Sequence, residues 1–232
     1  MNAAIIVTSM RIPTQRVSDY LRWNAEQIRD AGAILFVVCD QETATIGSDI
    51  SPDDLAIRWL VYPEVLKLFS ITRTGNYGIR RAVEEGYEPI MKSDIDVCFL
   101  GDLPELLRVD NCRASVPKYG DCASYDARLE PRRVMPDGQG TVCLTAYNWR
   151  KVQGYDERFE GWGGDDNELC KRLQELGIAI DDSRSVAHIE HPTPGGVDWH
   201  SDGFNRKNWA RNRTLTVRSP GSQPLWGIPL SE

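Results

Sequence analysis

Short apolar runs alternate with amphipathic segments along the first hundred residues. Residues 3–8, 34–39 and 57–62 are rich in β-branched and other apolar side chains, which is typical of buried strands. Residues 18–31 and 74–85 are amphipathic, and each is followed by a glycine, which is typical of a helix end. Strands that alternate with helices predict an α/β fold with a mostly parallel central sheet flanked by helices on both faces.

The second half of the chain predicts two further elements. Residues 142–147 predict a strand, and residues 165–176 predict a helix because three leucines recur at i, i+4 and i+7. Residues 109–141 are polar and rich in Pro, Asp and Arg. We therefore expect this stretch to be an active-site loop region and not a linker between domains.

The composition fits one compact catalytic unit. A chain of 232 residues with 41% hydrophobic content can bury a substantial core as a single domain. The six cysteines form no CxxC pair and lie partly in apolar runs, so we expect reduced, buried thiols. No run approaches the roughly 20 apolar residues that span a bilayer, and no basic flank precedes the first apolar run. Neither a membrane span nor a signal peptide is predicted.

Two acids interrupt an apolar stretch just beyond Ile90 and Met91, where a buried strand is expected to end. Because a strand does not bury two unpaired carboxylates without compensation, Asp94 and Asp96 need a partner. At i, i+2 spacing both can serve one divalent cation, directly or through its waters, at the carboxyl end of the strand. A DxD tripeptide is common on loops, so its position after a strand carries the metal hypothesis.

The predicted helix at 165–176 begins with acids that follow a glycine-rich run: Trp162, Gly163, Gly164, Asp165, Asp166 and Glu168. Asp165 and Glu168 fit a capping box, which stabilises a helix by about 0.5–2 kcal/mol. Capping leaves Asp166 and the glycine run unexplained. The alternative interpretation is chemistry on a hydroxyl group or a sugar.

Two of the three histidines, His188 and His191, lie three residues apart. Imidazole is the commonest transition-metal ligand, and this spacing can bring both rings to one ion. The pair therefore favours metal ligation over a packing role. His200 is less specific, and we interpret it as a surface or active-site loop residue.

The DxD pair, then Gly161-Trp-Gly-Gly-Asp-Asp166, then His188-Ile-Glu-His191 resemble, in this order, the A-type (GT-A) glycosyltransferases. The likeness is to the β-1,4-galactosyltransferase C-terminal region and to the polypeptide N-acetylgalactosaminyltransferase catalytic domain, and it covers about residues 70–192. It implies a GT-A nucleotide-sugar-binding fold and an inverting, metal-dependent transfer of a sugar from a UDP donor to a saccharide hydroxyl. The implied cofactor is Mn²⁺, with Mg²⁺ as the alternative.

The resemblance also implies roles for individual residues. Asp96, His188 and His191 would bind the metal, and Asp166 would be the general base on the acceptor hydroxyl. The implied donor-binding residues are Arg11, Asp40, Arg73, Asn76 and Asp94. The implied acceptor-binding residues are Trp162, Gly163, Gly164 and Asp165.

Some positions depart from the family or have an ordinary structural alternative. His188 stands where galactosyltransferases have a methionine, and Asn167 breaks the family's acidic run, which puts the acceptor in doubt more than the reaction. Asp40 also fits a plain turn residue. Arg73 and Asn76 also fit residues that cap and solvate the start of a helix.

Within the single domain of residues 1–232 we expect three parts: a nucleotide-sugar half at 1–100, an acceptor and metal half at 101–200, and a basic C-terminal lid or tail at 201–232. Residues 205–218 hold five basic side chains and no acid, in a chain of net charge -7. This segment fits a solvated face, a lid that clamps the donor pyrophosphate, or a contact to a polyanionic acceptor.

Three alternative functions stay open. The basic segment is compatible with a phage-type enzyme that glycosylates hydroxymethylated pyrimidines in DNA. A nucleotidyltransferase would need a glycine-rich basic loop after the first strand, where the chain has Ser9-Met-Arg-Ile-Pro13. A non-catalytic carbohydrate- or nucleic-acid-binding module would not need all three clusters. Because eukaryotic relatives carry a membrane anchor and none is predicted here, we expect a cytoplasmic enzyme of a bacterium or a phage-infected cell.

Overall fold

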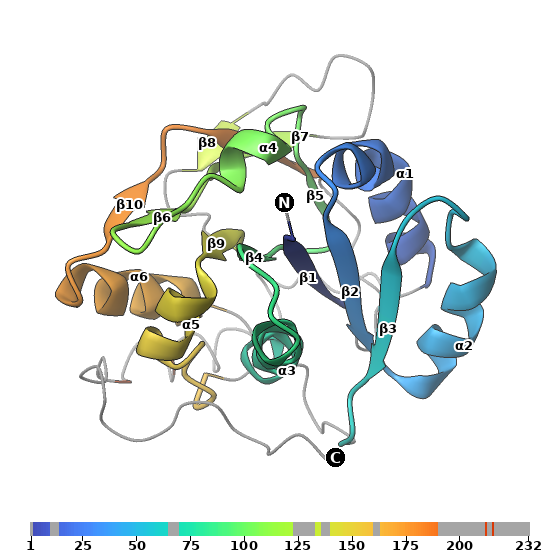
Figure 1. Ribbon diagram of the computed structural model, residues 1–232, viewed down its shortest axis with the longest axis horizontal. Helices are drawn as coiled ribbons and strands as arrows, with labels where there is room; N and C mark the ends of the chain where they lie inside the picture. The colour runs from blue at the N-terminus through green and yellow to red at the C-terminus, as the bar shows by residue number, and fades with distance from the viewer. Residues whose placement is uncertain are drawn as a thin grey trace.

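A twisted seven-stranded sheet runs through the middle of the molecule in the computed structural model (Figure 1). The structure describes residues 2–9, 14–64, 70–122, 133–135, 140–159 and 163–189, with Asn212 and Leu215. The strands of this sheet, in spatial order, are β10 (Ala179–Asp181), β6 (Arg113–Ser115), β9 (Val142–Leu144), β4 (Ile90–Lys92), β1 (Ala4–Ser9), β2 (Ile34–Cys39) and β3 (Ile57–Val61). Of these strands only β9 runs antiparallel to its neighbours. The expected mostly parallel sheet is confirmed.

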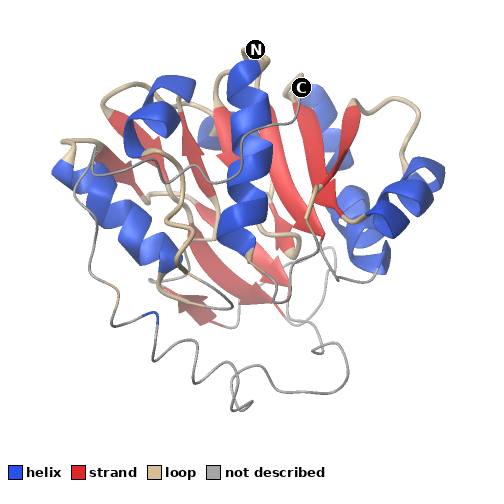
Figure 2. Cartoon of the chain, turned by 90° about the horizontal axis from the view of Figure 1, so that it is seen from below, coloured by secondary structure: helices blue, strands red, loops and turns tan. Residues whose placement is uncertain are grey.

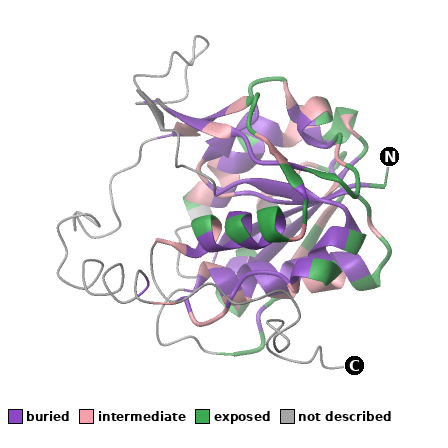
Figure 3. Ribbon diagram, turned by 90° about the vertical axis from the view of Figure 1, so that its left-hand side faces the viewer, coloured by how far each residue is buried: buried purple, intermediate pink, exposed green. Residues whose placement is uncertain are grey.

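Helices cover both faces of this sheet (Figure 2). Helices α1 (Thr14–Asp30), α2 (Gln41–Ile50) and α4 (Leu103–Leu106) pack into one apolar cluster with one face. Helices α3 (Ile71–Glu84), α5 (Ala146–Val152) and α6 (Asp165–Glu175) pack into the cluster on the other face. Buried and exposed residues alternate along these helices, as their amphipathic sequences require (Figure 3).

A second, four-stranded sheet lies beside the first. Its spatial order is β5 (Val97–Cys98), β11 (Ser185–Ile189), β7 (Lys118–Cys122) and β8 (Arg133–Met135). Helix α1 is fastened to it by Asn24, whose side-chain amide donates to the carbonyl of Val97 (2.7 Å) and accepts from the N–H of Phe99 (3.1 Å). The prediction of a loop region at 109–141 is therefore wrong in part, because β6, β7 and β8 are short strands without an alternating apolar pattern.

The predicted strand at 142–147 is correct only for its first three residues. Thr145 is the N-cap of α5, because its hydroxyl accepts a hydrogen bond from the N–H of Asn148 (3.1 Å). Trp149 is fully buried and donates from its indole to the carbonyl of Ile90 (2.9 Å). A capping hydroxyl and a buried tryptophan thus turn the apolar run into a helix start.

The cysteines and the membrane prediction can also be compared with the described part of the chain. All six cysteines are unbridged, and all except Cys112 are buried, as expected for reduced thiols. Burial raises the pKa of Cys39 and of Cys170 to about 12. Among the described residues, none of the helices has the length and apolar character that crossing a membrane requires.

Helix α3 lies so close to the sheet that one of its glycines is required by space. A methyl group added at Gly78 would lie 2.4 Å from Cγ2 of Ile6 and 2.8 Å from Cγ2 of Val38. For a methyl group added at Gly75, one turn earlier, the nearest atom is Cγ of Lys92 at 3.9 Å, an ordinary contact.

We predict that Gly78→Ala lowers the free energy of unfolding by about 1–3 kcal/mol through overpacking. Gly75→Ala, the matched control, should leave it unchanged or raise it by up to about 1 kcal/mol. Urea denaturation measures both, and equal effects at the two positions would contradict this packing.

Candidate functional site

The carboxyl ends of the six parallel strands share one edge of the main sheet, where open α/β sheets bind their ligands. Asp40 follows β2 at this edge, and Asp94 and Asp96 follow β4. Asp40 is the N-cap of α2, because its carboxylate accepts from the N–H of Thr43 (2.8 Å). It is therefore a helix cap and not the plain turn residue of the alternative interpretation, and its donor-binding role at the ligand edge stays a prediction.

The first acid of the DxD pair is held on both of its carboxylate oxygens. Lys92 donates from Nζ to Oδ1 of Asp94 (2.5 Å) and to the carbonyl of Gly140 (2.7 Å). The hydroxyl of Tyr119 donates to Oδ2 of Asp94 (3.1 Å) and lies 3.1 Å from the hydroxyl of Thr141. A Cβ at Gly140 would fall 1.8 Å from Asp94 Oδ2, so a side chain there would displace Asp94.

The second acid, Asp96, faces the first predicted histidine. Nε2 of His188 lies 3.5 Å from Oδ2 of Asp96, and the imidazole stacks on the ring of Tyr119 at 5.5 Å and 15°. The backbone is also tied, because the N–H of Ile189 donates to the carbonyl of Asp96 (2.8 Å). Strand β11 therefore brings two of the three predicted metal ligands together. His191, the third, lies outside the described residues.

A carboxylate beside an imidazole is a donor set that fits a divalent transition metal such as manganese. Within the part of the chain that the structure describes, no group of three or more histidine, cysteine or acidic side chains gathers closely enough to hold an ion. Asp96 and His188 are thus two of the three predicted ligands, and the third, His191, stays a prediction.

The predicted acceptor loop leads into helix α6. Gly163 and Gly164 both have φ of +94°, a conformation that favours glycine, and Gly164 is the N-cap of the helix. Asp165 and Asp166 are the first two helical residues. The side-chain amide of Asn212 donates to the carbonyl of Gly163 (2.9 Å), so a residue of the C-terminal segment contacts the glycine loop.

The capping-box interpretation of this helix is wrong. The N-cap carries no side chain, and Glu168 is drawn instead to Arg172, with both carboxylate oxygens 2.7 Å from its guanidinium nitrogens. Both side chains are buried, and Arg172 also donates to the carbonyl of Val152. The pair fastens α6 to α5, and Glu168 takes no part in a capping box.

Burial dominates the electrostatics of the two leading acids. It raises the pKa of Asp165, although the positive charge of Lys92 opposes the shift. Burial, and then repulsion by Asp165, raise the pKa of Asp166 well above its ordinary value, against the opposing effects of Lys92 and Tyr155. Among the described residues, Oδ1 of Asp166 is buried without a hydrogen-bond partner. The helix N-terminus alone would favour the ionised form, but here burial outweighs it.

For the pKa of Lys92, unlike that of the two acids, neighbouring charges outweigh burial. Burial lowers the pKa of Lys92, but the carboxylates of Asp94, Asp166 and Asp165 outweigh this effect and leave the pKa raised. Lys92 therefore stays charged. Its ammonium group is the common neighbour of Asp94 and of the α6 acids, which lie far apart in the sequence.

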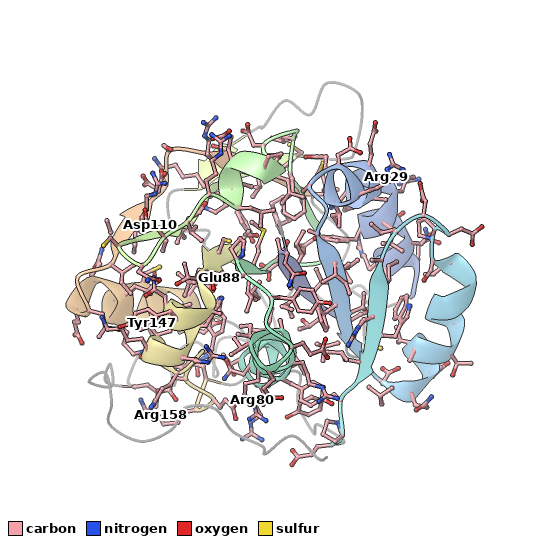
Figure 4. All side chains as sticks on the ribbon, viewed as in Figure 1. Arg29, Arg80, Glu88, Asp110, Tyr147 and Arg158 are labelled. Atoms are coloured by element: carbon pink, nitrogen blue, oxygen red, sulfur yellow. The ribbon has the colours of Figure 1, made fainter. Side chains whose placement is uncertain are left out.

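Asn76 is placed differently from the expectation that it binds the donor. Its side chain is fully buried, donating to the carbonyl of Tyr155 (2.9 Å) and to Glu157 (3.0 Å) and accepting from the N–H of Tyr155 (2.7 Å). This network fastens α3 to the segment before the glycine loop, so we assign Asn76 a supporting role. The same segment is braced by Asp156, which binds Arg158 with both carboxylate oxygens (Arg158 is labelled in Figure 4).

The remaining predicted residues divide into two groups. Arg73 lies half-buried in the first turn of α3, after the N-cap Ser70, so its donor role stays a prediction. The other positions lie outside the described residues: Arg11, Trp162, His191, His200 and all of 205–218 except Asn212 and Leu215.

Three residues of this site are not among the candidates from the sequence: Lys92, Tyr119 and Tyr155. A signal for Lys92 does exist, because a lysine at the end of an apolar strand is expensive to bury and stands beside the DxD acids. Tyr119 and Tyr155 come from segments with no such signal, and only the fold brings them to the acids.

Residues 126–193 match the family model described as the N-terminal domain of galactosyltransferase. Mouse (Mus musculus) β-1,4-galactosyltransferase 5 is 29% identical over 93 residues, which are 32% of this chain and 24% of that protein. Validoxylamine A glucosyltransferase of Streptomyces hygroscopicus subsp. jinggangensis (strain 5008) is 47% identical over 51 residues, 22% of this chain and 12% of that protein. The alignments thus span a quarter or less of each relative's length.

The whole fold is similar to a solved structure of a Drosophila β-1,4-galactosyltransferase 7 mutant in complex with manganese, UDP-Gal and xylobiose. The TM-score is 0.61 at 15% sequence identity, and the match covers 97% of this chain and 83% of that chain. At this identity the likeness establishes the fold, and the predicted GT-A fold is confirmed. The family match confirms the resemblance to galactosyltransferases in the segment that it covers.

The raised pKa of Asp166 predicts a pH dependence of stability. Because the pKa is higher in the folded protein than in the unfolded chain, folding favours the protonated form. This contribution is complete below the unfolded pKa and is lost as the pH rises through the folded pKa. Asp166→Asn cannot ionise, so its free energy of unfolding should rise relative to the parent as the pH increases above about 4, the ordinary pKa of the unfolded carboxyl.

Asp181 provides a control of opposite sign, because hydrogen bonds from Ser183 lower its pKa. Asp181→Asn should lose stability relative to the parent as the pH rises toward about 5, where the unfolded carboxyl has ionised, and the difference should stay constant at higher pH. Urea denaturation in EDTA-containing buffer measures both differences. A pH-independent difference for Asp166→Asn would show that Asp166 ionises as easily in the folded protein as in the unfolded chain.

Proposed function

We propose that this protein is a metal-dependent, inverting glycosyltransferase that moves a sugar from a UDP-sugar to a hydroxyl group of a saccharide acceptor. One observation carries the proposal: Asp94 after β4 and the acids that begin α6 meet around Lys92 at the carboxyl edge of a GT-A sheet. A binding module would need only one of these clusters. The family match to galactosyltransferases supports the same activity.

On the donor side, we assign Asp96 and His188 to metal binding, with His191 as the predicted third ligand. When bound, the metal would neutralise negative charge on the donor diphosphate. Asp94, whose orientation is fixed by Lys92 and Tyr119, retains lone pairs that can accept from a ribose hydroxyl or a metal-bound water.

On the acceptor side, we assign Asp166 as the general base. The acceptor oxygen attacks the anomeric carbon, its proton passes to the Asp166 carboxylate, and the bond from the anomeric carbon to the diphosphate oxygen breaks. A single displacement of this kind inverts the anomeric centre. A pKa raised by burial suits this role, because a base works best when its pKa approaches the working pH. Trp162, Gly163, Gly164 and Asp165 remain the proposed acceptor contacts.

One of the open alternatives, a modified-DNA acceptor, has no support here. The comparisons give none for a modified-DNA acceptor, and nearly all of the basic segment that suggested it lies outside the described residues. The β-1,4-galactosyltransferase 7 structure holds xylobiose, which favours a saccharide acceptor for this chain as well. A cytoplasmic location stays a prediction.

The general base can be tested by one isosteric change. Asp166→Asn keeps the shape of the side chain but cannot take up a proton, so sugar transfer should fall by at least about 10²-fold. Binding of UDP and Mn²⁺, measured by calorimetry, should stay close to the parent. The neighbouring control, Asp165→Asn, should chiefly raise the acceptor KM. If donor binding is lost together with the rate, Asp166 belongs to the donor site, and if transfer persists, another group is the base.

The metal site can be tested without turnover. Because Asp96 is the proposed direct ligand, Asp96→Ala should abolish the divalent-ion dependence of UDP binding, whereas Asp54→Ala at an exposed acid should not. His191→Ala should weaken Mn²⁺ binding more than His188→Ala, because only His191 matches a family ligand. Calorimetry with Mn²⁺ measures each variant. Parent-like Mn²⁺ affinity in both histidine variants would reduce the site to the DxD acids, and full activity in excess EDTA would exclude it.

A further inference from the structure

Lys92 is a charged side chain in the most protected part of the molecule. It is 1% exposed, it ends β4, and it pairs in register with Ile6 of β1 and Val142 of β9. Its stem lies over α3, where a Cβ added at Gly75 would be 3.9 Å from Cγ of Lys92. Because strands flank it on both sides and a helix covers it, the ammonium group cannot reach bulk water and must be compensated from within.

More negative groups surround the ammonium group of Lys92 than one structural ion pair would supply. The ammonium group donates to Asp94 at 2.5 Å and to the carbonyl of Gly140 at 2.7 Å, and it lies 5.8 Å from the ring centroid of Tyr155. Asp165 and Asp166 of α6 add two more carboxylates in electrostatic range. One buried cation therefore serves three acids, one from the donor side of the site and two from the acceptor side.

We propose that Lys92 is a positioning residue that fixes Asp94 for the donor and, by its charge, favours the ionised form of Asp166 that the reaction needs. This inference rests on the proposed function and deepens it. It links the two halves of the site through a single side chain, so that losing the cation changes both donor binding and base strength.

The surroundings of Asp166 determine the sign of the effect. Asp165 and Cys170 face it from its own helix, Lys92 and Asp94 from the end of β4, and Tyr155 from the segment before α6. Lys92 is the cation among these described neighbours. Removing it leaves acids and neutral groups, so Asp166 should hold its proton to a higher pH.

The experiment compares Lys92→Met, which keeps the length of the side chain without its charge, with the parent. The acid limb of the pH–rate profile should move to higher pH by about 1–3 units, with a higher KM for the donor. Lys151→Met is the control, because Lys151 also lies over an aromatic ring, Tyr147 at 5.9 Å, but on the surface. It should keep the parent profile. A slower or less stable Lys92→Met protein with an unmoved acid limb would mean that Lys92 is only structural.

A second readout separates this inference from the proposed function. The ¹³C carboxyl resonance of Asp166, assigned with Asp166→Asn, should titrate at higher pH in Lys92→Met than in the parent, whether or not the protein turns over a nucleotide sugar. If Lys92→Met does not fold, Lys92→Met/Asp94→Asn is compared with Asp94→Asn alone, so that the loss of Asp94 is common to both proteins and the comparison isolates the charge of Lys92. An unmoved titration in the folded variant would overturn the role of Lys92. Absence of turnover in the parent, with the titration shifted as stated, would overturn the proposed function alone.

Discussion

The buried ammonium group of Lys92 determines which groups must surround the end of β4. Taking an unpaired ammonium ion out of water costs several kcal/mol, so the fold must bring negative groups to it. The nearest are Asp94 and the carbonyl of Gly140, and the acids at the start of α6 complete the set. Segments from three parts of the chain therefore have to meet at the end of β4. The same requirement concentrates acids at the edge where the sheet would bind its ligand.

The remaining architecture holds these groups in place without using them. Arg172 binds Glu168 and the carbonyl of Val152, which anchors α6 to α5 with Asp165 and Asp166 as its first two residues. Asn76 fastens α3 to the segment that precedes the glycine loop. These contacts hold the segments that carry the acids, and the acids themselves are buried. Burial raises the pKa of Asp166, which suits the proposed general base.

The local pattern of apolar and polar residues predicted the helices and strands that are defined by burial of one face or both. The apolar run of β2 has the predicted bounds, and α6 begins at the expected residue, because burial on one face or both leaves a clear periodicity. Strands β6, β7 and β8 are short and are defined by their partners, so the sequence showed only a polar stretch. The DxD acids, the α6 acids and His188 were predictable from residue type and spacing. The meeting of Asp94 with the α6 acids around Lys92 was not, because it depends on tertiary charge compensation.

The most direct test of the account is a thermal-shift measurement of the parent protein with a panel of nucleotide sugars, each with and without Mn²⁺. A ligand that binds only the folded state stabilises it by about 2.7 kcal/mol at a hundredfold excess over Kd. The account predicts that a UDP-sugar raises the Tm with Mn²⁺ and much less in EDTA. No shift with any nucleotide sugar in Mn²⁺ would contradict a donor site at this edge of the sheet, and an equal shift in EDTA would contradict its dependence on metal.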